Sequence, residues 1–249
     1  MPIVLVTRPK DDAEEFVSAL ASRGFECAHV PTIEIAPIAD WQTPNLAACD
    51  GIIFTSVNAV RCFIPALLAR EPNSLSRLRH LTHYAVGEKT LRALRECGIE
   101  SALCADEANA DHLANLLKTR GISGKRFLFA CGNRARSVIP TVIAQNGGVC
   151  DELVVYETRD VSAQNLEKLK TLLACKDVEW ASFFSPSAAA SFFNALRNFA
   201  FPSRLKFAAI GKTTQAAIEA MGFRVDAVAS VPSAEALAEA IASATRKTA

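Results

Sequence analysis

The chain has 249 residues, of which 50% are hydrophobic and 21% are charged, and 27 Lys and Arg nearly balance 26 Asp and Glu to leave a net charge of +1. This composition excludes a disordered chain, which lacks the apolar surface to offset its ordering entropy, and it shows none of the basic excess typical of nucleic-acid binders. The length favours two domains of about 125 residues over one.

The first residues predict a buried strand, because a short apolar run ending at Val6 is followed at once by charges. This run is too short for a signal peptide, and no stretch approaches the ~18 apolar residues that a membrane helix needs. The eight cysteines are scattered, form no C-x-x-C pair and share no ligand spacing with the four histidines. We therefore expect a cytoplasmic chain without disulfides, without a metal and without membrane or nucleic-acid partners.

Short apolar runs alternate with helical patterns along the chain. A helix is predicted from about residue 11 to residue 23, since it begins with acidic residues and ends before Gly24. The fold class predicted is α/β, with two similar doubly wound parallel-sheet domains. Six runs lack polar alternation, as strands do when helices cover both faces of a sheet: Val4–Val6, Gly51–Phe54, Tyr84–Val86, Phe127–Ala130, Ala181–Phe184 and Phe207–Ile210.

Comparison of the chain with itself indicates an internal duplication. The segment Tyr84–Leu117 aligns without a gap with Ala208–Ile241, 124 residues further on, and nine of the 34 positions are identical. Three blocks in one order at nearly one spacing favour duplication over chance similarity between alanine-rich segments. The other two blocks, the second weaker, match at 129 and 123 residues: Phe54–Ala59 with Phe183–Ala188, and residues 3–35 with 126–158.

The loops that follow the predicted strands are rich in hydroxyl groups, glycine and arginine, and ligands of doubly wound sheets bind at such strand ends. Hydroxyls and amides at helix N-termini suit phosphates or carboxylates, although the same residues also cap helices without binding anything. We expect these loops to face one cleft and therefore predict an anion-binding site there. The six loops are Thr7–Pro9, Thr55–Asn58, Gly87–Thr90, Cys131–Arg136, Ser185–Ser187 and Gly211–Thr214.

One segment and two tyrosines need separate interpretation. Gly211–Thr214 ends like a P-loop, but Lys206 stands where that motif needs its first glycine, which disfavours nucleotide hydrolysis. Tyr84 lies in a strand-like run and is predicted to belong to the core. Tyr156 lies in the strand-like stretch Glu152–Thr158, where packing is the ordinary interpretation of a tyrosine.

Taken together, these residues resemble the uroporphyrinogen-III synthase family over nearly the whole chain. The sequence departs from the family at Cys131, where an arginine is common, and at Ser137, where an acidic residue is common; Arg134 could supply the missing cation. Motifs that are weak one by one but specific in order and spacing carry the resemblance: Val6–Pro9, Phe54–Val60, Gly132–Asn133 with Arg136, Val155–Thr158, Phe184–Ala188 and Ile210–Thr214.

The resemblance implies a cofactor-free lyase acting on hydroxymethylbilane, a linear tetrapyrrole rich in carboxylates. The enzyme would expel the terminal hydroxyl as water, invert the last pyrrole ring through a spiro intermediate and close the macrocycle; the free substrate also closes without inversion. A monomer is expected, and transient contact with hydroxymethylbilane synthase is left open. The domains implied are residues 1–34 with 160–249 and residues 38–155, with linkers at 34–37 and 156–159 and a cleft between the domains.

The resemblance also implies roles for single residues. Tyr156 would donate a proton or a hydrogen bond to the departing hydroxyl. Two other functions stay open: a two-lobed binding protein that closes on a small anionic ligand, and, disfavoured by the missing carboxylate and phosphate motifs, a sugar-nucleotide transferase. Nine further residues would hold carboxylates or pyrrole nitrogens, some through backbone amides: Arg8, Ser56, Asn58, Gly132, Asn133, Arg136, Ser185, Ser187 and Thr214.

Overall fold

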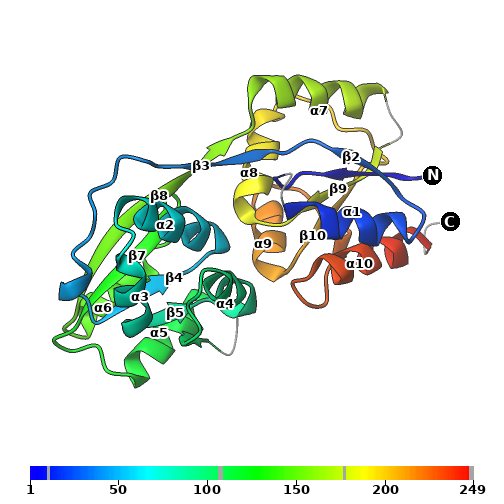
Figure 1. Ribbon diagram of the computed structural model, residues 1–249. Coiled ribbons are helices and arrows are strands. Elements are labelled where there is room, and N and C mark those ends of the chain that lie inside the picture. The colour runs from blue at the N-terminus through cyan, green and yellow to red at the C-terminus, as the bar shows by residue number, and fades with distance from the viewer. Residues whose placement is uncertain (10–11, 106–108, 176–177, 247–249) are drawn as a thin grey trace. The chain divides into compact units, whose positions relative to one another are not determined.

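The computed structural model describes residues 1–9, 12–105, 109–175 and 178–246 (Figure 1). The predicted start of the first helix at Asp11 lies outside these residues. The chain divides into two compact units. Unit 1 comprises residues 1–34 and 159–249, and unit 2 comprises residues 35–158.

Unit 1 holds a five-stranded sheet in the order β11-β10-β9-β1-β2, in which all neighbouring strands are parallel. Its strands are β1 (Ile3–Val6), β2 (Glu26–His29), β9 (Val178–Phe183), β10 (Lys206–Ala209) and β11 (Ala227–Val228). Its helices are α1 (Glu14–Ala21), α7 (Ala163–Cys175), α8 (Pro186–Ala195), α9 (Lys212–Ala220) and α10 (Ala234–Arg246).

Unit 2 holds a six-stranded sheet in the order β3-β8-β7-β4-β5-β6, and the pairs from β8 to β6 are parallel. Strands β3 and β8 cross the limits of this unit and carry the chain between the two units. The strands are β3 (Ile33–Pro37), β4 (Gly51–Phe54), β5 (Thr82–Ala85), β6 (Ala102–Cys104), β7 (Arg126–Gly132) and β8 (Val149–Asp160). The helices are η2 (Leu46–Ala48), α2 (Val57–Arg70), α3 (Ser74–His80), α4 (Gly87–Glu96), α5 (Ala110–Thr119) and α6 (Val138–Gln145).

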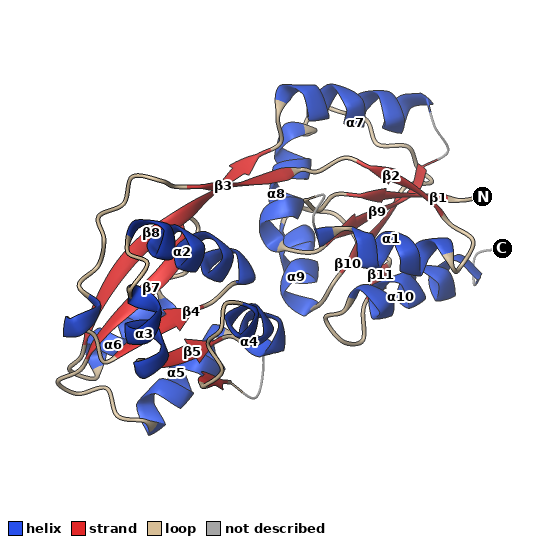
Figure 2. Cartoon of the chain, in the orientation of Figure 1, coloured by secondary structure: helices blue, strands red, loops and turns tan. Residues whose placement is uncertain are grey.

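Helices flank the strands of each unit, and both faces of each sheet are buried (Figure 2). In unit 1, Val4 and Val6 pack with Phe16 of α1, whereas Leu5 packs on the opposite face with Phe192 of α8. Neighbouring residues of a strand point to opposite faces, so a run without polar residues is what two buried faces require. The predicted α/β fold with doubly wound parallel sheets is therefore confirmed.

The two sheets repeat one arrangement, which agrees with the duplication seen in the sequence. Counted from one edge, the order is β2-β1-β9-β10-β11 in unit 1 and β8-β7-β4-β5-β6 in unit 2. Strands at equivalent places begin 123 to 127 residues apart along the chain. Unit 1 therefore combines the start of the first copy with the end of the second, and unit 2 combines the remaining halves.

All six predicted strands are present, and their limits lie within three residues of those expected. The first helix is shorter than predicted, because α1 ends at Ala21 and the chain then turns through Gly24, whose φ is 80°. Among the described residues, no helix is both long and apolar enough to cross a membrane. The seven cysteines with described side chains are thiols, and burial raises the pKa of Cys131 to about 11.

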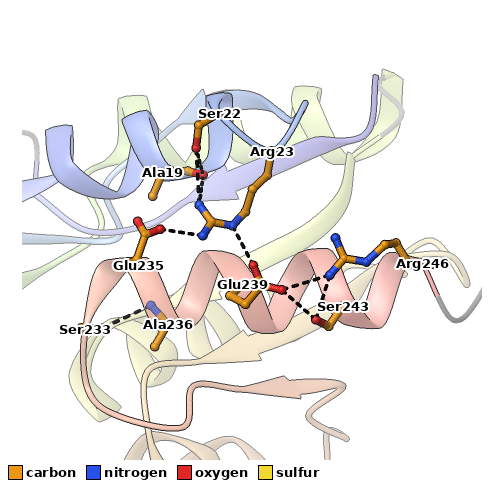
Figure 3. Close-up of polar contacts among 9 residues, drawn as sticks. All are labelled: Ala19, Ser22, Arg23, Ser233, Glu235, Ala236, Glu239, Ser243 and Arg246. Atoms are coloured by element: carbon orange, nitrogen blue, oxygen red, sulfur yellow. Dashed lines mark hydrogen bonds and ion pairs between the residues drawn. The ribbon is translucent and has the colours of Figure 1, made fainter.

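Arg23 joins the end of the first helix region to α10 (Figure 3). Its Nη2 and Nε lie 2.6 and 3.0 Å from carboxylate oxygens of Glu235 and Glu239, and its Nη1 donates to the Ala19 carbonyl oxygen at 2.8 Å. The Arg23 side chain is only 20% exposed. Two of these contacts join segments more than 200 residues apart in the sequence, and the third fixes the rigid guanidinium to α1.

Replacing Arg23 by Met is expected to lower Tm by about 2–4 °C, because the carboxylates lose their shared partner while the apolar stem is kept. Thermal unfolding at low and high salt measures this, and the difference from the wild type should narrow as salt screens the ion pairs. Arg92→Met is the matched control, since Arg92 is 79% exposed and, within the described part of the chain, pairs only with Glu96 along its own helix. An equal loss in both variants would contradict the role of Arg23.

Candidate functional site

In unit 2 the carboxyl ends of β4 and β7 lie side by side, and the end of β7 is level with Tyr156 within β8, because β7 is the parallel neighbour of both other strands. There the hydroxyl oxygen of Tyr156 lies 3.1 Å from Ser56 Oγ, and the two groups form a hydrogen bond. Ser56 directly precedes α2, whereas Tyr156 lies in β8, 100 residues later. The fold thus brings together two of the residues that the sequence singled out.

An irregularity in the pairing of β7 with β8 sets the place of Tyr156. Cys131 pairs with Val154, but the next residue, Gly132, pairs with Tyr156, so that Val155 is passed over. Val155 is fully buried, and its carbonyl oxygen accepts a hydrogen bond from Ile38 N–H at 3.0 Å. An extra residue of this kind re-aims the side chains beside it. Here it places the Tyr156 ring directly over the backbone of Gly132.

Gly132 is required at this position by the closeness of the ring. A Cβ atom on residue 132 would lie 2.4 Å from Tyr156 Cζ and 2.8 Å from its hydroxyl oxygen, closer than any real side chain approaches. The ring of Tyr156 therefore occupies the space that a side chain at position 132 would need. The prediction that it holds a carboxylate through its backbone stays a prediction.

We expect Gly132→Ala to lower the free energy of unfolding by about 1–3 kcal/mol and to reduce activity, because the added methyl group displaces the Tyr156 ring. Urea unfolding measures the first effect. Gly211→Ala is the control, since its backbone is extended and nothing lies within 4 Å of the added Cβ. In a Tyr156→Ala background the cost of Gly132→Ala should fall to the level of this control. If it does not, the strain lies elsewhere.

Asn133 fastens the loop after β7 to β8. Its backbone N–H donates to the Tyr156 carbonyl oxygen at 3.1 Å, and its Oδ1 accepts from Thr158 N–H at 2.9 Å. The predicted role in substrate binding would therefore fall to the amide nitrogen of the side chain, since the oxygen already serves the fold. By holding the backbone on both sides of residue 157, Asn133 also supports the position of Tyr156.

The remaining predicted residues of unit 2 are less enclosed. Asn58 is half-buried in the first turn of α2, and Arg134 and Arg136 are exposed in the loop after β7. Cys131 is buried in the core with Phe129. The positive charges of this loop, on Arg134 and Arg136, therefore lie at the surface. The contact of Arg136 with the substrate stays a prediction.

Unit 1 presents an equivalent set of groups at the ends of β1 and β9. The guanidinium of Arg8 lies 4.2 Å from the centroid of the Phe184 ring, and Phe184 packs edge-on against Phe16 at 4.8 Å. Arg8 Nη2 lies 3.8 Å from an Asp12 oxygen. Burial lowers the pKa of Arg8 more than Asp12 and Glu15 raise it. A cation partly removed from water, and only loosely paired, favours an anionic ligand.

Hydroxyl groups complete the set in unit 1. Ser185 caps α8 by accepting from Ala188 N–H at 3.1 Å, and its Oγ lies 3.0 Å from that of Ser187. Thr214 is only 2% exposed, and Thr90, its counterpart in the other copy, is 3% exposed. Their burial leaves little side-chain surface for a ligand. The predicted contact of Thr214 with the substrate would therefore be made by its backbone at the start of α9, and it stays a prediction.

The sequence did not point to Phe184 or Phe16 as neighbours of the site. A signal existed for Phe184, because it occupies the place of Thr55 in the repeated block, where one copy has a hydroxyl and the other an aromatic ring. Stacking against Arg8 explains the ring, since a guanidinium over an aromatic face is held flat and stays charged. Phe16 lies on α1 and could be connected with Arg8 only through the fold.

The electrostatics around Tyr156 favour the neutral phenol. Burial raises the pKa of Tyr156, and the hydrogen bond with Ser56 opposes this rise in part. Within the described residues, no group of three or more His, Cys, Asp or Glu side chains is placed to hold a metal ion. The chemically active groups at these strand ends are therefore a phenol, aliphatic hydroxyls, backbone amides and guanidinium groups.

The fold and the site define a class of protein: two doubly wound α/β units, each assembled from both halves of a duplicated chain, with polar loops at the strand ends. The family model described as uroporphyrinogen-III synthase HemD matches residues 14–239. The uroporphyrinogen-III synthase of Chlorobaculum parvum is 38% identical over 244 residues, 98% of this chain and 99% of the relative. The chain belongs to the uroporphyrinogen-III synthase family of enzymes.

Further relatives agree with this assignment. A putative uroporphyrinogen-III synthase of Methanocaldococcus jannaschii is 30% identical over 227 residues, 89% of this chain and 90% of the relative. Two crystal structures share the fold: a mutant uroporphyrinogen III synthase of Thermus thermophilus, with a TM-score of 0.70 at 18% identity over 99% of this chain and all of that one, and the Helicobacter pylori synthetase, with a TM-score of 0.66 at 21% identity over 98% and 99%.

Proposed function

We propose that this protein dehydrates and cyclises hydroxymethylbilane to uroporphyrinogen III, with inversion of the terminal pyrrole ring, as a cyclising hydro-lyase that needs no cofactor. The main support is the similarity to the Chlorobaculum parvum synthase along 98% of the chain. The hydrogen-bonded pair of Tyr156 and Ser56 at the strand ends of unit 2 gives the proposal its chemistry.

The dehydration needs one proton at the departing oxygen. In the proposed step the O–H bond of Tyr156 breaks, its proton joins the terminal hydroxyl of the substrate, and the carbon–oxygen bond breaks to release water. The pyrrole rings delocalise the cation that remains. The pyrrole carbon that closes the macrocycle loses one proton, which restores the phenol. A phenol is protonated at neutral pH, and burial raises the pKa of Tyr156 further, so that Tyr156 carries the proton that the step needs.

The protein must also favour the inverted product. Selecting it a hundredfold takes about 2.7 kcal/mol of differential transition-state stabilisation. A few hydrogen bonds that fit only the spiro geometry supply this amount. No strong acid or nucleophile is required for such a step, which is consistent with strand-end loops built from hydroxyls and amides.

Carboxylate recognition is the second part of the proposal. In unit 1, Arg8 with Ser185 and Ser187 would hold acetate or propionate groups, and Thr214 would contribute through its backbone. In unit 2, Asn58, Asn133 and Arg136 would do the same around Tyr156. We further propose that the enzyme works as a cytoplasmic monomer, with at most transient contact with hydroxymethylbilane synthase.

The test is to generate hydroxymethylbilane in situ with its synthase, add this protein, oxidise the products and separate the porphyrin isomers. Uroporphyrin III is the expected result. The uninverted isomer alone would contradict the assignment. Binding of a porphyrin carboxylate without any change in the isomers would instead favour a two-lobed binding protein for anions.

A further inference from the structure

We propose that Ser56 is a positioning residue for Tyr156: it donates its hydroxyl hydrogen to the phenolic oxygen and thereby turns the hydrogen of Tyr156 toward the departing hydroxyl. The inference rests on the acid role proposed for Tyr156. It assigns to Ser56 a task different from holding a carboxylate of the substrate.

Counting hydrogens at the pair favours this direction. Ser56 Oγ carries one hydrogen and two acceptor positions, and it already accepts from Ala59 N–H at 3.1 Å. Geometry at 3.1 Å permits either hydroxyl to donate to the other. If Tyr156 donated, its only hydroxyl hydrogen would be used inside the protein. If Ser56 donates, both contacts of Ser56 are satisfied and the phenolic hydrogen remains for the substrate.

The ring of Tyr156 is held from two sides, so its hydroxyl has a defined direction. Gly132 lies beneath the ring, with the phenolic oxygen 2.8 Å from the place of a Cβ, and Ser56 lies at the hydroxyl end. The backbone of Tyr156 is also fixed, because its carbonyl oxygen accepts from Asn133 N–H. A phenol confined in this way loses little freedom on binding substrate, which is the condition for an oriented proton donor.

Ser56 also connects Tyr156 with the positive end of a helix. Ser56 is the N-cap of α2, a helix of 14 residues, and the N-terminus of such a helix carries a partial positive charge. When the proton leaves, the phenolate keeps the electron pair and accepts a charge-assisted hydrogen bond from Ser56. The hydrogen bond with Ser56 accordingly lowers the pKa of Tyr156 against the effect of burial.

The other copy of the repeat separates capping from this function. Ser185 caps α8 through the same contact, with Ala188 N–H at 3.1 Å, but the neighbour of its Oγ is Ser187 and not a tyrosine. Capping alone therefore does not require a phenol at this place. Ser185→Ala gives the stability cost of losing such a cap, against which Ser56→Ala can be compared.

The experiment is a titration of Tyr156 by NMR, with ¹³C-labelled tyrosine. The chain has only two tyrosines, so a Tyr84→Phe background leaves one signal. We expect Ser56→Ala to raise the pKa of Tyr156 and to lower kcat for uroporphyrinogen III about tenfold, with little change in KM. Ser56→Thr, which keeps the hydroxyl, should restore both values. Ser185→Ala should lower stability comparably and leave the pKa of Tyr156 unmoved.

Ser56→Gly provides a second variant if Ser56→Ala folds poorly, because glycine at an N-cap costs only a few tenths of a kcal/mol. An unmoved Tyr156 pKa in active, folded Ser56 variants would overturn the role of Ser56 alone. A wild-type protein that forms no uroporphyrinogen III would overturn the proposed function, whatever the titration shows. A larger change in KM than in kcat would also contradict positioning and favour direct substrate binding.

Discussion

Tyr156→Phe is expected to lower kcat for uroporphyrinogen III about a hundredfold or more, because a general acid contributes rate factors of this size. The phenyl ring would still pack against Gly132, so the substitution removes only the hydroxyl group and its hydrogen bond with Ser56. Single-turnover kinetics with freshly generated hydroxymethylbilane measures the change. Since spontaneous closure gives the uninverted isomer, the product mixture should also shift toward that isomer.

Tyr84→Phe is the matched control for this experiment. Tyr84 is 4% exposed in the core of unit 2 and packs edge-on against Phe127, with ring centroids 6.0 Å apart. It should keep both the rate and the isomer ratio. Full activity of Tyr156→Phe would remove the acid role of Tyr156, while the assignment of the reaction would still depend on the isomer formed by the wild type.

His83→Phe is expected to make the protein less sensitive to acid. His83 is fully buried in β5 and stacks on Phe54 with centroids 6.3 Å apart. Among the residues that the structure describes, neither ring nitrogen meets the geometry of a hydrogen bond, and the backbone of Leu81 opposes the effect of burial on the pKa only in part. Unit 1 has Phe207 at the equivalent position of β10, 124 residues later, so the fold already accepts a phenyl ring at this place.

The pH range follows from the burial of the imidazole. Burial lowers the pKa of His83 to about 4, against 6.5 for an ordinary histidine. Between these two values the unfolded chain binds a proton that the folded chain does not, so stability is lost as the pH falls from 6.5 toward 4. The full loss is about 3 kcal/mol. His83→Phe removes this contribution and leaves that of the carboxylates.

Urea unfolding between pH 7.5 and pH 4.5 measures this difference. The free energy of unfolding should fall less steeply for His83→Phe than for the wild type, and the variant should be at least as stable at pH 7.5. His80→Phe provides the control for the exchange of an imidazole for a phenyl ring, because His80 is exposed at the end of α3. Parallel profiles for the wild type and His83→Phe would contradict the prediction.

Much of the fold could be predicted because it depends on patterns that are local in the sequence. Runs such as Gly51–Phe54 carry no polar residue, and only strands covered on both faces have this composition. The six runs do not include β2, β3, β6, β8 or β11, and two of these strands, β2 and β6, have no fully buried position. Their place at the edge of a sheet explains this, since an edge strand is covered less completely.

The candidate site was only partly accessible from the sequence. Hydroxyls after strands, such as Ser56 and Ser185, stood out because a strand end followed by a helix start is a local pattern. Tyr156 was singled out only through the resemblance to a known family, since its place in a strand indicates ordinary packing. Arg8 could be recognised as a strand-end cation, whereas its stacking on Phe184 could not, because the two residues lie in different copies of the repeat.

By itself, the sequence determined the strand and helix pattern, the parallel sheets and the duplication, because period, composition and self-similarity are properties of the chain. Only the tertiary structure decided that each unit takes half of each copy, and that Gly132, Ser56 and Tyr156 meet. The physical reason is that the meeting depends on one passed-over residue, Val155, in the register of two strands. A shift of one residue in the register reverses the face to which every following side chain points. The sequence around Tyr156 contains no local pattern that predicts this shift.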